Sequence, residues 1–100
     1  STDKEDHVSM GVTSGRKLHE VIRNVKTCLA IEFLCNTQGI YLLRPLKTTS
    51  TLEKVYSLIR NHVPPIEKDR VFKPDIENIL KLISNFEILN VVEEDIGELK

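Results

Sequence analysis

Aromatic side chains are scarce in this 100-residue chain, which has no tryptophan, three phenylalanines and two tyrosines. A hydrophobic core must therefore be built mainly from leucine, isoleucine and valine. Four glycines and four prolines exclude a collagen-like or low-complexity chain. No apolar run approaches the roughly 20 residues that cross a bilayer, and the polar residues 1–10 are unlike a signal peptide. We therefore expect a cytoplasmic protein with no membrane partner.

An excess of either charge is also missing. Fourteen lysines and arginines stand against 15 aspartates and glutamates, for a net charge of -1. This balance gives no electrostatic footprint for nucleic acid, so we expect no nucleic-acid partner. The two cysteines, Cys28 and Cys35, lie seven residues apart, or about 10 Å along a helix, which excludes a disulfide between them. No further cysteine or histidine pair completes a zinc-type ligand set. We expect both cysteines to be buried and no metal to bind.

What the chain does have is one long helical pattern, predicted over residues 13–38. Thr13 or Ser14 can cap its start, and Gly39 stands where a left-handed C-terminal cap is expected. Over Cys28 to Cys35 only Glu32 is polar, and a helix that is apolar all round must be buried all round. The apolar residues that recur at helical spacing are Leu18, Val21, Ile22, Val25, Cys28 and Leu29.

The predicted helix is too long for a domain of this size. Twenty-six residues span roughly 39 Å, whereas a compact 100-residue domain is about 33 Å across. Other surfaces must cover it, so we expect a fragment of a longer protein or an obligate oligomer.

The remainder reads as a connection and shorter helices. An irregular connection over 39–50 leads to a second helix over 51–63, whose start carries a capping box from Ser50 to Glu53. Pro64 ends that helix, and Pro74 opens a third helix over 74–84. A last short helix is expected over 86–96. The chain is thus predicted to be all-α: one helical segment over 1–100, with one long helix followed by two or three shorter ones, part of a larger oligomeric helical bundle.

Most catalytic-looking patterns fail on their context. His19-Glu20 begins like a zinc-protease helix, but Arg23 occupies the position of the second histidine. No glycine-rich phosphate loop or nucleophile elbow is present. The polar run Glu5-Asp6-His7 remains, and it can serve either as acid-base machinery or as a charged loop that leads into the long helix.

That run extends to Glu5-Asp6-His7-Val8-Ser9-Met10-Gly11, which resembles the active-site segment of the aromatic amino acid lyase family, in its histidine ammonia-lyase branch. Further matching motifs follow in the family's order and spacing. The phenylalanine and tyrosine lyases typically carry glutamine where this chain has Glu5. The collinear motifs are Leu29-Ala30-Ile31-Glu32, Gln38-Gly39, Arg44-Pro45-Leu46-Lys47, Leu52-Glu53, Asp69-Arg70 and Pro74-Asp75-Ile76-Glu77.

The resemblance implies a helical homotetramer that eliminates ammonia from L-histidine to give trans-urocanate. It also implies an electrophilic methylidene-imidazolone, a cofactor that the family forms from an internal Ala-Ser-Gly. This chain lacks that triplet, and Thr13-Ser14-Gly15 is expected to open the long helix instead. We therefore expect no cofactor in this chain, no activity from it alone, and either a homotetramer or a complementing N-terminal chain as its partner.

Glu5 alone carries over as an active-site residue. The matching glutamate of the family faces the imidazole of the substrate, where a carboxylate can accept an N–H hydrogen bond. Asp6, His7 and Ser9 are expected to hold the loop around it, in an active-site loop over 1–12. The competing hypothesis is an inactive helical oligomerisation or interaction module derived from the same family. Lys4 departs from the family's glutamine and could pair with Glu5.

Overall fold

The computed structural model describes residues 2–97, with side chains from residue 14 onward. It contains four helices, α1 (Thr2–Leu42), α2 (Ser50–Arg60), α3 (Lys73–Ser84) and α4 (Glu87–Ile96). No β-strand occurs within residues 2–97, so the all-α prediction is confirmed. None of these helices is both long and apolar enough to span a bilayer.

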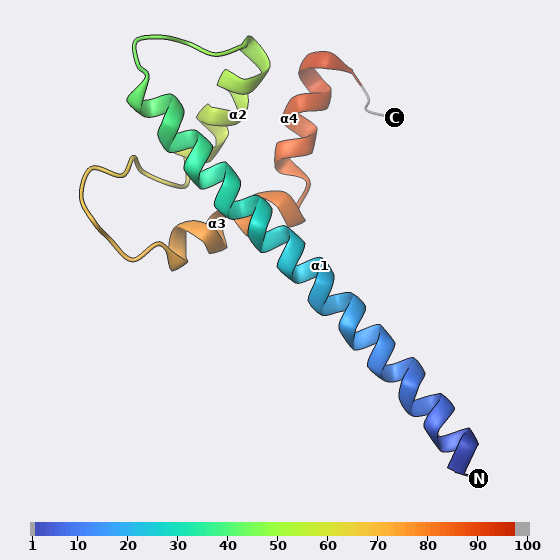
Figure 1. Cartoon of the computed structure of the whole chain (residues 1–100). Coiled ribbons are helices and arrows are strands. Elements are labelled where there is room, and N and C mark those ends of the chain that lie inside the picture. Colours follow the sequence, from blue (N-terminus) through green and yellow to red (C-terminus); the bar gives the residue numbers. More distant parts are fainter. Residues whose placement is uncertain (1, 98–100) are drawn as a thin grey trace.

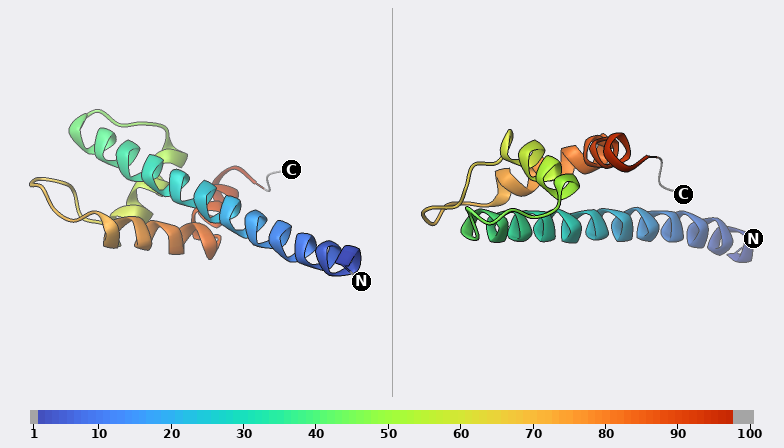
Figure 2. Two further views of the ribbon diagram at one scale, coloured as in Figure 1. Left: turned by 60° about the horizontal axis from the view of Figure 1, so that its bottom comes forward. Right: turned by 90° about the horizontal axis from the view of Figure 1, so that it is seen from above.

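The long helix α1 dominates the shape of the molecule. At 41 residues it is about 62 Å long, and the radius of gyration of 18.5 Å exceeds the roughly 13 Å of a compact domain of this size. In Figure 1, α2, α3 and α4 gather around the C-terminal half of α1, and its N-terminal half projects away from them. Seen from above, the three short helices lie on one side of α1 (Figure 2, right).

The core lies between the C-terminal half of α1 and the three short helices. Amphipathic patterning explains it, because each short helix turns one apolar stripe inward. α1 packs mainly on α3, and α2 packs on α4. The buried apolar side chains are Ala30, Leu34, Val55, Ile59, Val63, Ile79, Leu82 and Ile88.

The ends of α1 differ from the sequence prediction. The helix begins at Thr2, so the backbone of residues 2–12 is helical where a loop was expected, and Thr13 and Ser14 lie inside it. No proline interrupts this stretch, so the helix can continue. At the other end α1 passes through Gly39 to Leu42, because packing of the last turn overrides the glycine stop signal.

The helices α2, α3 and α4 begin and end within three residues of the predicted ranges. The predicted capping box at α2 is wrong in register. Thr49, not Ser50, is the N-cap, and its hydroxyl accepts a hydrogen bond from the backbone N–H of Leu52. The carboxylate of Glu53 accepts a hydrogen bond from the backbone N–H of Thr48 at 2.9 Å. Glu53 therefore still acts as a capping acid, but it stands four residues after the N-cap where the prediction had three.

Candidate functional site

The residues predicted for the active site lie at the start of α1. The backbone of Glu5, Asp6, His7 and Ser9 is helical, and their side chains lie outside the described residues. Their roles therefore stay predictions.

One side of α1 is apolar and uncovered by this chain. We call it the uncovered stripe: Leu18, Val21, Ile22, Val25 and Leu29, each between 40% and 60% exposed. These residues recur at the spacing of one helix face. Soluble monomers rarely leave a contiguous apolar row of this kind open to water.

Another side of α1 is covered by the short helices. Ala30 is fully buried and Leu34 nearly so, whereas Cys28, Ile31 and Cys35 on the same turns are exposed. The prediction that both cysteines are buried is therefore wrong for this chain by itself, because no segment of residues 14–97 reaches that side.

Where α1 ends, cations and aromatic rings alternate. The guanidinium of Arg60 lies 5.6 Å from the ring centre of Tyr41 and 5.1 Å from that of Tyr56. The guanidinium of Arg44 lies 4.5 Å from the ring centre of the same Tyr56. Such cation–π contacts add about 0.5–1 kcal/mol each at exposed sites. Arg60 also donates to the backbone carbonyls of Thr37 and Val63, which ties α1 and α2 together.

Ion pairing extends this arrangement into the connection after α1. Arg44 forms a two-pronged salt bridge with Glu53, with N–O distances of 2.7 and 2.6 Å. The hydrogen bonds from Arg44, helped by the backbone N–H of Thr48, lower the pKa of Glu53 from 4.5 to about 2. The phenol of Tyr41 donates to Glu67, and that hydrogen bond raises the pKa of Tyr41.

The loop between α2 and α3 is fastened by two long-range clamps. The amide of Gln38 exchanges two hydrogen bonds with the backbone of Ile66, at 2.9 and 3.0 Å. Arg70 donates to the carbonyls of Pro64 and Pro65 and pairs with Asp75 at 2.9 Å. Sequence reasoning missed both clamps, although Arg70 and Asp75 stood in motifs that it had singled out.

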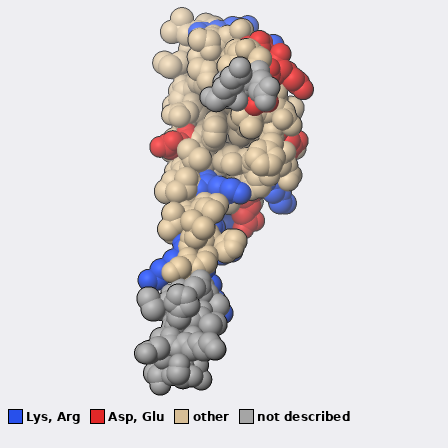
Figure 3. Space-filling view, turned by 90° about the vertical axis from the view of Figure 1, so that its right-hand side faces the viewer, with Lys and Arg blue, Asp and Glu red and all other residues tan. Residues whose placement is uncertain are grey.

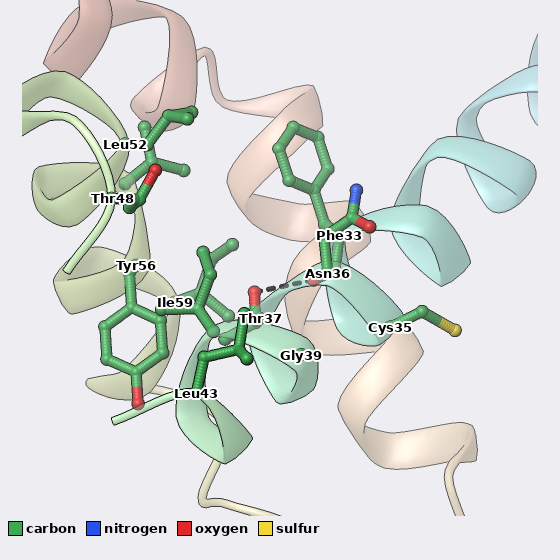
Figure 4. A pocket seen from close by; sticks show the side chains of 12 residues that line it. Phe33, Cys35, Asn36, Thr37, Gly39, Leu43, Thr48, Leu52, Tyr56 and Ile59 are labelled. Carbon is green, nitrogen blue, oxygen red and sulfur yellow. Dashed lines mark hydrogen bonds between the residues drawn. The ribbon is translucent and has the colours of Figure 1, made fainter. Parts of the chain in front are cut away.

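A hollow of about 420 Å³ opens between the last turns of α1 and the start of α2 (Figure 4). Apolar side chains, among them Phe33, Leu43 and Ile59, line most of it. The hydroxyl of Thr37 is occupied, because it donates to the backbone carbonyl of Phe33 at 2.5 Å. The side chain of Cys35 points away from the hollow in Figure 4. The described side chains of the hollow therefore include no nucleophile with an adjacent base.

The side chains of residues 14–97 include neither a cluster of metal ligands nor the precursor triplet of the family's electrophile. This part of the chain holds no group of three histidine, cysteine or acidic side chains close enough to bind a metal ion. The family electrophile needs Ala-Ser-Gly, but the single alanine, Ala30, precedes Ile31. Ser14 lies inside α1, where the intact helical backbone gives no ring-forming turn. These residues do not fit a methylidene-imidazolone.

Comparisons with known proteins agree with the resemblance seen in the sequence. The histidine ammonia-lyase of Rattus norvegicus is 50% identical over 91 residues, which is 91% of this chain and 14% of the relative. That of Legionella pneumophila (strain Lens) is 46% identical over 96 residues, or 94% of this chain and 19% of the relative. The crystal structure of histidine ammonia-lyase from Trypanosoma cruzi superposes with a TM-score of 0.73 at 47% identity, covering 75% of this chain and 15% of that one.

This chain thus spans a fifth or less of the length of these relatives. The family described as aromatic amino acid lyase matches residues 1–61, well over half of the chain. This chain belongs to the aromatic amino acid lyase family.

Proposed function

We propose that this chain is the C-terminal part of a histidine ammonia-lyase and contributes to an enzyme that converts L-histidine to trans-urocanate and ammonia. The observation that carries the proposal is the 46–50% identity to histidine ammonia-lyases over more than nine-tenths of the chain. Glu5 supports the choice of histidine over other aromatic substrates, because a carboxylate can accept a hydrogen bond from an imidazole N–H. In this role Glu5 selects the substrate, and other residues of the enzyme cleave the bond.

The proposal includes inactivity of the chain alone. Its sequence lacks Ala-Ser-Gly, and its described side chains offer no substitute electrophile. The electrophile and the remaining substrate contacts must come from the part of the enzyme outside this chain. No step of the elimination itself is assigned to the residues of this chain.

The uncovered stripe is proposed as the chain's contribution to the subunit interface of a helical homotetramer. None of its five residues belongs to the buried core of this chain. Burying apolar surface stabilises association by about 25 cal/mol per Å². In this proposal another helix of the enzyme core covers the uncovered stripe.

Exchange of Glu5 in a complete enzyme tests the proposed role of this residue. This chain would replace the matching segment of the Legionella pneumophila enzyme, and Glu5→Gln would be compared with Glu20→Gln, an exposed residue of the same helix. We expect Glu5→Gln to lower kcat/KM for L-histidine at least about tenfold, since it removes the charge from an ionic hydrogen bond. An unchanged kcat/KM would remove Glu5 from the site.

The second candidate function is an inactive helical module that assembles through α1. One observation favours it: the chain has the uncovered stripe but lacks the triplet that forms the electrophile. Analytical ultracentrifugation of the isolated chain and of a Val21→Glu/Val25→Glu variant tests it. Assembly of the wild-type chain that the variant loses would support the module, and a stable, folded wild-type monomer would refute it.

A further inference from the structure

A basic groove lies where α1 leaves the body of the molecule, and it shares only Ile22 with the uncovered stripe. Its volume is about 460 Å³, within the range of small-ligand sites. α1 forms one wall and the end of α3 forms the other. The residues that line it are His19, Ile22, Arg23, Lys26, Leu80 and Ser84.

The nitrogen-bearing side chains of the groove converge on one side of α1. His19, Arg23 and Lys26 are four and three residues apart, which places them on a single helix face. Within residues 14–97 none of the three forms an ion pair with a carboxylate. Lys26 is engaged only by a long hydrogen bond of 3.5 Å to the hydroxyl of Ser84.

Charge is segregated in this part of a nearly neutral chain. Residues 14–31 contain four lysines and arginines and a single acidic residue, Glu20. In Figure 3, blue side chains lie along α1 between the body of the molecule and the grey segment. A local cationic surface of this kind attracts anions even when the net charge of the whole protein is close to zero.

The end of α3 does not satisfy these cations. A helix C-terminus carries a partial negative charge that can hold a lysine. Here, however, two of the last carbonyls of α3 already accept backbone hydrogen bonds, from Asn85 to Lys81 at 2.9 Å and from Phe86 to Ile83 at 3.1 Å. Most of the hydrogen-bonding capacity of Arg23 and Lys26 is therefore left for an external anion.

The floor of the groove is partly apolar, since Ile22 and Leu80 line it together with the polar side chains. Three nitrogen donors with a hydroxyl opposite match the oxygens of a phosphate group, and an apolar floor matches an attached organic group. We propose that this groove is a binding site for a phosphate-bearing small molecule. The site is independent of Glu5 and of the lyase reaction.

Calorimetric titration of the full 100-residue chain at low ionic strength tests the proposal, with inorganic phosphate and phenyl phosphate as the two probes. We expect saturable binding with a Kd below about 1 mM. Tighter binding of phenyl phosphate would assign the groove to organic phosphates, and equal binding would assign it to free phosphate. Arg23→Gln/Lys26→Gln should weaken binding at least about tenfold, because the arginine and lysine charges of the groove are both lost.

The matched control is Lys68→Gln/Lys73→Gln, which removes the same charge from exposed residues away from the groove. It should bind as the wild-type chain does. A charge-preserving Arg23→Lys/Lys26→Arg variant should retain binding, which separates loss of charge from loss of fold. Absence of saturable binding to the wild-type chain, or an equal loss in the control variant, would overturn the proposal.

Discussion

Replacing Arg70 by methionine should destabilise the fold more than the loss of one surface charge would. Arg70 donates to two backbone carbonyls, those of Pro64 and Pro65, at 2.6 and 2.8 Å, and it pairs with Asp75. The side chain of Asp75 is only 9% exposed, so the substitution leaves a nearly buried carboxylate without its cation. Stranding one member of a buried pair costs about 3–5 kcal/mol. The position of Asp75 in the first turn of α3 offsets about 0.3–1 kcal/mol of this.

The expected net loss is therefore about 2–5 kcal/mol of unfolding free energy, or a fall in Tm of at least about 10 °C for a chain of this size. Circular dichroism during thermal and urea unfolding measures it. Lys68→Met, two residues away and exposed, is the control and should change stability by less than about 0.5 kcal/mol. Adding Asp75→Asn to Arg70→Met should recover part of the loss. A change below about 0.5 kcal/mol for Arg70→Met would refute the reasoning.

Three smaller predictions concern the other ends of the helices. The pKa of Glu53 is lowered from 4.5 to about 2. The stability from its pairing with Arg44 is therefore present above pH 4.5 and is lost as the pH falls toward 2. The urea midpoint of the Glu53→Gln variant should depend less on pH over this window than that of the wild-type chain. Thr49→Ala removes the acceptor for the N–H of Leu52 and should cost about 1 kcal/mol in urea unfolding, whereas no change would exclude Thr49 as the cap. Phe86 is exposed and has a φ of 59°, so Phe86→Gly should raise Tm through a gain of about 0.5–1 kcal/mol; a fall would show that its ring contributes more than the backbone strain costs.

Local patterns in the sequence predict the short helices well, because their apolar spacing and their proline signals act within a few residues. Pro74 opens α3, and the stripe that contains Ile79 faces the core. The end of α1 could not be predicted in this way. Gly39 is a stop signal in isolation, but Gln38 and Tyr41 on either side of it are held by Ile66 and Glu67, far along the chain. Such contacts are invisible to a local pattern.

For the candidate site, too, local sequence predicts some features and misses those that depend on other parts of the protein. Glu5 is predicted from the run of residues around it, whereas composition alone describes only a charged loop. The prediction that Cys28 and Cys35 are buried is wrong for this chain. An apolar helix surface indicates that something covers it, but it does not indicate which segment or chain does so. In the proposed enzyme, a neighbouring subunit or the missing part of the same chain would cover this side of α1.

Urocanate formation from L-histidine, followed by its absorbance, tests the central claim most directly. It would be measured for the isolated chain and for a Legionella pneumophila enzyme whose matching segment is replaced by this one. The account predicts no turnover by the isolated chain and clear turnover by the replaced enzyme. Turnover by the isolated chain, or a folded but inactive replaced enzyme, would contradict it.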